Sequence, residues 1–103
     1  MATRREKIEQ MLTKEPRDAF LNFSLAMELV KEGQTDLALS QFDRVLEVDG
    51  KYLAAHFQKG NTLLALRRLE DARAALGAGI RAAQSIGDSH AACEMQEVLD
   101  GIA

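Results

Sequence analysis

The strongest constraint on this chain is a repeat of about 34 residues within its own sequence. When the chain is shifted by this length, apolar residues fall on apolar residues and small residues fall on small ones. Matching pairs include Ile8 with Phe42, Leu12 with Leu46, Phe23 with Phe57, Leu29 with Leu63, Phe42 with Leu76 and Ala38 with Ala72. A fixed period of this length predicts one supersecondary unit stacked on copies of itself.

Helical periodicity dominates the chain, and no segment alternates between apolar and polar residues over the length of a strand. Thr3 and Glu6 have the spacing of a capping box at a helix start. Pro16 predicts the end of that first helix, and Asp18 is a suitable cap for the second. Gly33 predicts the left-handed residue at the end of the second helix.

The remaining boundary signals lie further along the chain. We expect the other helices to begin at a Thr35 cap, near Lys51, near Leu69 and after Gly87-Asp88. The short connections make neighbouring helices antiparallel. The predicted fold class is therefore all-α, an antiparallel helix-turn-helix solenoid of about six helices.

Length and charge exclude several classes of protein. With 103 residues the chain is long enough for one domain. Its net charge is −3, and basic residues such as Arg4 and Arg5 are interleaved with acidic ones, which predicts a mixed, solvated surface and no nucleic-acid partner. No stretch approaches the ~20 apolar residues of a membrane span, and the first residues do not read as a signal peptide. A single cysteine, Cys93, favours a cytoplasmic location.

Small and large residues recur at fixed places in each copy of the repeat. The first helices carry Asn22, Leu25, Ala26 and Leu29, then His56, Lys59, Gly60 and Leu63; the second helices carry Ala38, Phe42, Val45 and Gly50, then Ala72, Leu76 and Gly79. These residues resemble the tetratricopeptide repeat, a 34-residue helix-turn-helix unit. The family's Trp is absent, and Arg67 stands where the first copy has Gly33. The resemblance implies a single domain made of a half repeat (3–16), two full repeats (17–50 and 51–86) and a capping helix (87–103).

The same resemblance implies a function. In this family the first helices of successive repeats line a concave groove in which peptides or helices lie. The corresponding lining residues here are Phe20, Phe23, Met27, Phe57, Asn61, Leu64 and Met95. Together they are more apolar than a solvated surface requires, and the Asn61 amide can hydrogen-bond to a peptide backbone. We therefore expect a non-catalytic protein–protein interaction module that binds an apolar or amphipathic segment of a partner protein. The alternative is homo-oligomerisation, for example a homodimer, through the same groove or an end face.

One specialised use of the family's groove is not expected. Family members that act as co-chaperones clamp the C-terminal carboxylate of heat-shock chaperones with Lys and Asn side chains. The corresponding positions here are Phe23, Met27, Gln58, Asp88 and Ala92. The cations of that clamp are missing.

A third possibility is an enzyme or metal protein that uses His56, His90 and Cys93. His90 and Cys93 are three residues apart, so that both fit on one helical face, and His56 lies one period before His90. A structural zinc site needs four ligands, and no second pair supplies them. We instead expect packing roles, with Cys93 as a small core residue. No cofactor, metal or catalytic residue is predicted.

The small residues of the repeat lead to a test. Ala38→Leu and Ala72→Leu should each destabilise the fold by about 1–3 kcal/mol, because a larger side chain forces the paired helices apart. Urea denaturation followed by circular dichroism measures this loss. Two neutral substitutions would contradict the packing that the repeat predicts.

Overall fold

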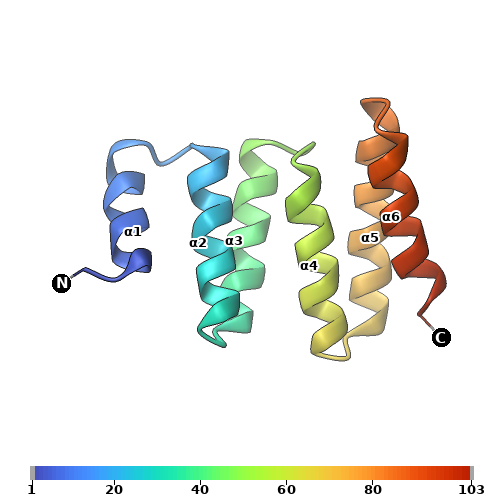
Figure 1. Ribbon diagram of the computed structural model, residues 1–103, viewed down its shortest axis with the longest axis horizontal. Helices are drawn as coiled ribbons and strands as arrows, with labels where there is room; N and C mark the ends of the chain where they lie inside the picture. Colours follow the sequence, from blue (N-terminus) through green and yellow to red (C-terminus); the bar gives the residue numbers. More distant parts are fainter. Residues whose placement is uncertain (1, 103) are drawn as a thin grey trace. The chain divides into compact units, whose positions relative to one another are not determined.

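The computed structural model describes residues 2–102, which form α-helices joined by short turns (Figure 1). The helices in this range are α1 (Arg4–Lys14), α2 (Ala19–Lys31), α3 (Thr35–Val48), α4 (Leu53–Ala65), α5 (Leu69–Ser85) and α6 (Ser89–Asp100). Two compact units divide the chain, Met1–Gly50 and Lys51–Ala103. Within each unit consecutive helices are antiparallel and packed on each other. The predicted all-α class with antiparallel helix pairs is confirmed.

Local hydrogen bonds explain why the first two helices begin where they do. The hydroxyl of Thr3 accepts from the backbone N–H of Glu6 at 3.1 Å, and the Glu6 carboxylate accepts from the N–H of Thr3 at 3.3 Å. Both halves of the predicted capping box are therefore present. At α2 the Asp18 carboxylate accepts from the N–H of Leu21 at 2.8 Å, as predicted for an N-cap.

The start of α3 differs from the prediction by one residue. Thr35 is the first helical residue, and Gln34 is the N-cap, without a side-chain hydrogen bond. The carbonyl of Gln34 already accepts the first intrahelical bond, from the N–H of Ala38 at 2.9 Å. The prediction that Thr35 caps this helix is wrong because the turn after α2 is completed at Gly33, one residue earlier than a Thr35 cap requires.

The turn between paired helices is built in the same way in both repeats. Gly33 has φ +78°, and its N–H donates to the carbonyl of Val30 at 3.0 Å. Arg67 has φ +61°, and its N–H donates to the carbonyl of Leu64 at 2.9 Å. The left-handed region costs a residue with a Cβ roughly 1–2 kcal/mol, so the second repeat keeps the turn at the expense of some strain.

In the first unit, small and aromatic side chains form the interface between α2 and α3. Ala26, Ala38 and Phe42 are fully buried, and the rings of Phe23 and Phe42 lie 6.1 Å apart at a tilt of 50°. Tilted aromatic pairs at this distance add to the free energy gained by burial. The predicted use of Ala26 and Ala38 as small interface residues agrees with their complete burial.

A buried amide joins three segments of the first unit. Asn22, which occupies the place of an aromatic residue in the repeat pattern, donates to the carbonyls of Pro16 at 3.1 Å and Asp18 at 2.8 Å. Its side-chain oxygen accepts from the amide of Gln41 at 2.7 Å. Each polar atom of this buried side chain therefore has a partner, which removes the penalty for burying it. The network fixes the loop before α2 to α2 itself and to α3.

In the second unit, two glycines admit large side chains. A Cβ on Gly60 would lie 2.7 Å from a methyl carbon of Leu76, and a Cβ on Gly79 would lie 2.7 Å from the Cβ of His56 and still closer to the sulfur of Met95. Leu76, Ala83 and Met95 form the fully buried core of this unit. At Gly79, side chains of both α4 and α6 therefore approach the backbone of α5.

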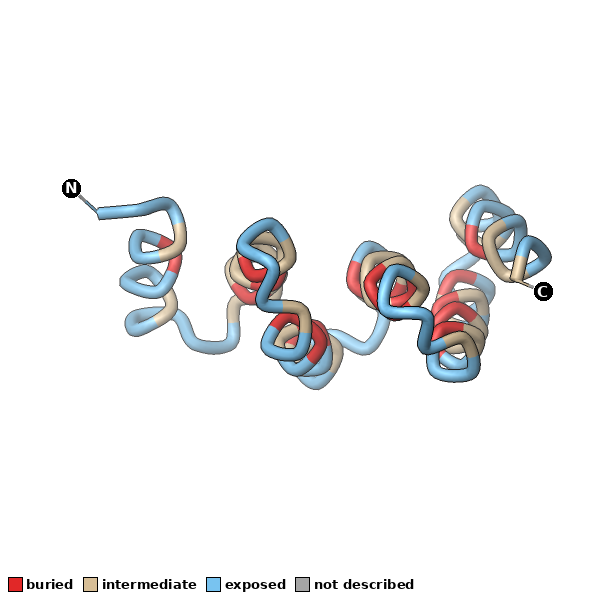
Figure 2. The backbone as a smooth tube through the Cα atoms, turned by 90° about the horizontal axis from the view of Figure 1, so that it is seen from below, coloured by how far each residue is buried: buried red, intermediate tan, exposed pale blue. Residues whose placement is uncertain are grey.

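The N-terminal helix is attached differently from the others. Ile8 is the one buried residue among the residues of α1, whereas α5 buries Ala72, Ala75, Leu76, Gly79 and Ala83. In Figure 2 the red, buried part of the backbone is small in α1 and larger in α5. Burial of one such side chain contributes about 1.5–3 kcal/mol. The apolar attachment of α1 is therefore weak.

The two glycines of α5 form a matched pair for a test. Gly79→Ala should destabilise the fold by about 1–3 kcal/mol because Met95 and His56 leave no room for a Cβ. Gly77→Ala should be neutral or stabilise it by up to about 1 kcal/mol, because alanine favours helix and the nearest atom to a new Cβ is an Arg81 nitrogen at 3.5 Å. Urea denaturation of both variants gives the two free energies of unfolding. Equal effects would show that α5 is not packed as described.

Candidate interaction surfaces

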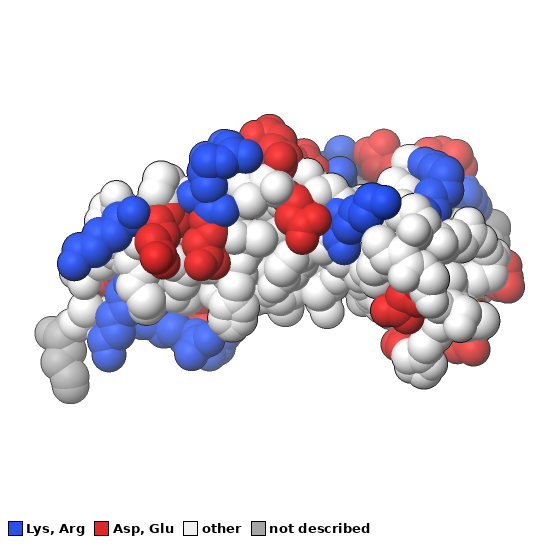
Figure 3. All heavy atoms as spheres, turned by 90° about the horizontal axis from the view of Figure 1, so that it is seen from above, with Lys and Arg blue, Asp and Glu red and all other residues white. Residues whose placement is uncertain are grey.

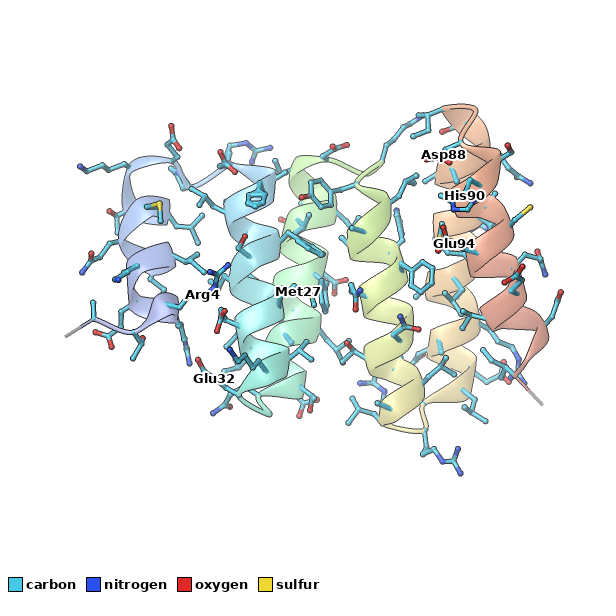
Figure 4. The ribbon with its side chains drawn as sticks, viewed as in Figure 1. Arg4, Met27, Glu32, Asp88, His90 and Glu94 are labelled. Atoms are coloured by element: carbon cyan, nitrogen blue, oxygen red, sulfur yellow. The ribbon has the colours of Figure 1, made fainter. Side chains whose placement is uncertain are left out.

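The first apolar surface is a stripe on α2, formed by Phe20, Phe23 and Met27 and called here the α2 stripe. Their spacing of three and four residues places them on one side of the helix. Phe20 lies in the first turn, where the Asp18 cap holds the backbone, and 61% of its surface is exposed. Phe23 and Met27 are half-buried, and Figure 4 labels Met27 on this helix. The stripe is therefore most open at its N-terminal end.

The second surface is the corresponding stripe on α4, formed by Phe57, Asn61 and Leu64 and called the α4 stripe. All three residues are half-buried. Phe57 packs against the core of Leu76, Ala83 and Met95. It consequently contributes to the stability of the second unit as well as to its surface, which makes it a poor position for a test of binding.

Met95 does not belong to either surface. The sequence predicts that it lines the groove, but the structure places it in the core with no exposed surface. The physical reason is Gly79, whose missing side chain leaves the space that the Met95 thioether fills. The repeat pattern contained this signal, because a small residue at position 79 requires a large neighbour to fill the space beside it.

The His and Cys residues are dispersed over different environments. His56 is buried in α4, and His90 is largely exposed on α6, where its Nε2 lies 2.7 Å from the Glu94 carboxylate. Figure 4 labels His90 and Glu94 one turn apart. Cys93 is exposed, so the expectation that it is a core residue is wrong. The exposed side of α6 is largely polar.

No metal centre emerges from these residues. Across residues 2–102, no group of three or more His, Cys, Asp or Glu side chains is placed to hold a metal ion. Within the same range no helix has both the length and the apolar character needed to cross a membrane.

Two ion pairs connect α1 to α2, and the sequence reasoning missed both. The Arg4 guanidinium lies 2.7 Å from the Glu28 carboxylate, and that of Arg5 lies 2.9 Å from Glu32. Figure 4 labels Arg4 on α1 and Glu32, the C-cap residue that follows α2. The hydrogen bond from Arg5 to Glu32 raises the pKa of Arg5. The Glu9 carboxylate approaches the same guanidinium at 3.6 Å.

The solvated surface predicted for these charges is thus only partly correct. Acidic and basic side chains are intermixed on the face drawn in Figure 3, but just 14% of the Glu28 side chain is exposed. Arg5 and Glu32 are 27 residues apart in the chain. A pairing over that distance leaves no local signal, since each residue alone is typical of an exposed helix.

The comparisons with known proteins agree with the repeat geometry. The tetratricopeptide repeat family matches residues 29–92. A TPR repeat-containing protein of Pseudomonas aeruginosa is 33% identical over 94 residues, which cover 91% of this chain and 90% of that protein. A Bordetella parapertussis protein of known solution structure is 31% identical, with a TM-score of 0.85, and the match covers 99% of this chain and 89% of that one. The TPR2B domain of yeast Sti1, in a complex with pHsp70, shares the fold with a TM-score of 0.85 at 19% identity, over 92% of this chain and 76% of that one.

The exposure of Cys93 can be measured directly. In the native protein a disulfide reagent such as Ellman's reagent should modify one thiol per chain, to the same extent as in denaturant, because the Cys93 side chain lies outside the core. If the thiol reacts only after denaturation, Cys93 is buried in the native protein and the exposure described here is wrong. Cys93→Ser is the control for reagent specificity.

Proposed function

The chain belongs to the tetratricopeptide repeat family, and we propose that it is a non-catalytic protein–protein interaction module that binds an apolar or amphipathic segment of a partner protein. Domains of this family are generally protein–protein interaction modules. The observation that most supports the proposal is the exposure of Phe20 at the head of the α2 stripe. An aromatic side chain that a well-capped helix keeps exposed to solvent contributes little to the stability of the fold. It offers a large contact area to a partner.

The neighbouring residues extend this contact area. Phe23 and Met27 continue the apolar surface of Phe20 along the next two turns of α2. The flexible thioether of a methionine adapts to partners of different shape, and the aromatic rings supply contact area. On α4 the amide of Asn61 offers both a donor and an acceptor for the backbone of a bound peptide. The α2 and α4 stripes are therefore the surfaces that we assign to binding.

The chemistry of the α2 stripe separates this proposal from the clamp of a chaperone carboxylate. The yeast Sti1 domain is a fold relative that was solved with pHsp70. In this chain the α2 positions that correspond to the clamp are Phe23 and Met27, which carry no charge for a carboxylate. We propose that the partner segment enters with apolar side chains instead.

The alternative is self-association through the same stripes. Exposed Phe20 supports it as well as the first proposal. Self-association through the end at α6 has less support, because the outer side of that helix carries Ser89, His90, Cys93, Glu94, Gln96, Glu97 and Asp100. Catalysis has little support either, since His56 is buried while His90 and Cys93 are exposed. The exposed thiol fits a reducing compartment such as the cytoplasm.

Peptide display against the full chain tests the proposal. We expect selected peptides to be apolar or amphipathic and to lose roughly 10- to 100-fold in affinity for Phe20→Asp, the equivalent of one buried aromatic side chain. Leu37→Asp is the matched control, because Leu37 is 52% exposed and belongs to α3, not to either stripe. It should leave the affinity unchanged. Fluorescence anisotropy with a labelled peptide gives both values.

The same variants separate the two alternatives. Peptides that bind the wild type, Phe20→Asp and Leu37→Asp equally would refute the α2 stripe as the binding surface. A wild-type dimer in light scattering that Phe20→Asp converts into folded monomers would favour self-association. Circular dichroism confirms that both variants remain folded, as their exposed positions predict.

A further inference from the structure

We infer that the side of α2 carrying Glu28, together with Glu32 at the C-cap of that helix, is a docking surface for a basic amphipathic helix, called here the α1 seat, and that α1 of a second copy of this chain can occupy it. Two chains would then form a dimer by exchanging their N-terminal helices. This goes beyond the proposed peptide binding, because it uses another side of α2 and other residues.

The α1 seat requires cations. The Glu28 side chain is 14% exposed, and its carboxylate lies 2.7 Å from Arg4. A carboxylate so far withdrawn from water is costly unless an opposite charge stays close to it. Glu32, one turn further along, receives a hydrogen bond from Arg5 at 2.9 Å. Two carboxylates one turn apart thus select a helix that carries two adjacent arginines.

The apolar part of the contact is small. Ile8 is buried, Leu12 is half-buried, and the other side chains of α1 from Glu6 to Lys14 are exposed. The recognition element is therefore Arg4, Arg5 and Ile8, and no large core must be broken to release it. The α1 of a second copy has the same element at the same spacing, so that it fits the seat without any new interface.

The connection allows α1 to leave while α2 stays intact. Asp18 caps α2, and Asn22 holds the carbonyl of Pro16 at 3.1 Å, so that the start of α2 is anchored without α1. Glu15, the C-cap of α1, is exposed and precedes the proline, which disfavours the helical conformation for it. The path between the helices, from Glu15 to Asp18, is short, and short hinge loops favour exchange between chains.

Charge reversal gives a direct experiment with full-length chains. One variant carries Glu28→Arg and Glu32→Arg, and the other carries Arg4→Glu and Arg5→Glu. Within either chain α1 now meets like charges and should be released. In a mixed dimer with exchanged helices both contacts are complementary again. We therefore expect two monomeric variants with reduced helix content, and a 1:1 dimer with recovered helix content when they are mixed at low salt.

The controls make either outcome decisive. A chain with all four substitutions restores complementary charges within one molecule and should match the wild type in helix content and stability. If the seat variant alone fails to fold, the single pair Arg5→Glu and Glu32→Arg serves instead, since Glu32 is 39% exposed and tolerates a longer side chain. High salt should dissociate the mixed dimer, because screening weakens exposed ion pairs.

Light scattering and native mass spectrometry distinguish the outcomes. A mixture that remains the sum of its two components, while the chain with four substitutions is folded, would show that α1 docks only within its own chain, and the inference would be wrong. A mixed dimer that Phe20→Asp abolishes would also overturn it, because the α2 stripe and not the α1 seat would then hold the chains together. A mixed dimer that keeps its 1:1 composition with Phe20→Asp supports it.

Discussion

The close approach of helices at small residues determines which side chains this protein can offer to a partner. Where a glycine stands, as at Gly60 and Gly79, a large neighbour such as Leu76 or Met95 enters and is lost to the surface. Ala26 and Ala38 occupy the corresponding interface of the first unit and are fully buried. The side chains that remain exposed are those that lie outside these helix–helix contacts. Phe20 is one of them, because it lies in the first turn of α2, ahead of the segment that packs on α3.

Much of this fold could be predicted from the sequence, because its determinants are local. The capping box of Thr3 and Glu6, the Asp18 cap and the left-handed Gly33 all depend on residues within four positions of each other. Arg67 shows that period and position carry more information than residue type at that turn. The arginine adopts the conformation that the glycine has one repeat earlier. The prediction placed the N-cap of α3 at Thr35, one residue after the actual N-cap, Gln34.

The surfaces could be predicted less well, because they depend on neighbours that the sequence does not place. Periodicity puts Cys93 and Met95 on α6 but does not say which side of that helix faces the core. The choice is made by Gly79, which leaves room for the Met95 sulfur, and Cys93 is then exposed. Arg5 and Glu32 are an extreme case. Each is an ordinary charged residue of an amphipathic helix, and their pairing becomes apparent only when α1 is folded back on α2.

The two surfaces assigned to α2 are compatible with each other for a geometric reason. At about 100° per residue, Phe20, Phe23 and Met27 lie on one side of the helix, while Glu28 and Glu32 are rotated from Phe20 by about 80–120°. A partner on the α2 stripe therefore need not displace α1 from its seat. Ionic strength acts on the two contacts differently, since the α1 seat depends on ion pairs and the α2 stripe on apolar burial. Salt would thus weaken the attachment of α1 to its seat while it leaves peptide binding in place, which allows the two contacts to be studied separately without any substitution.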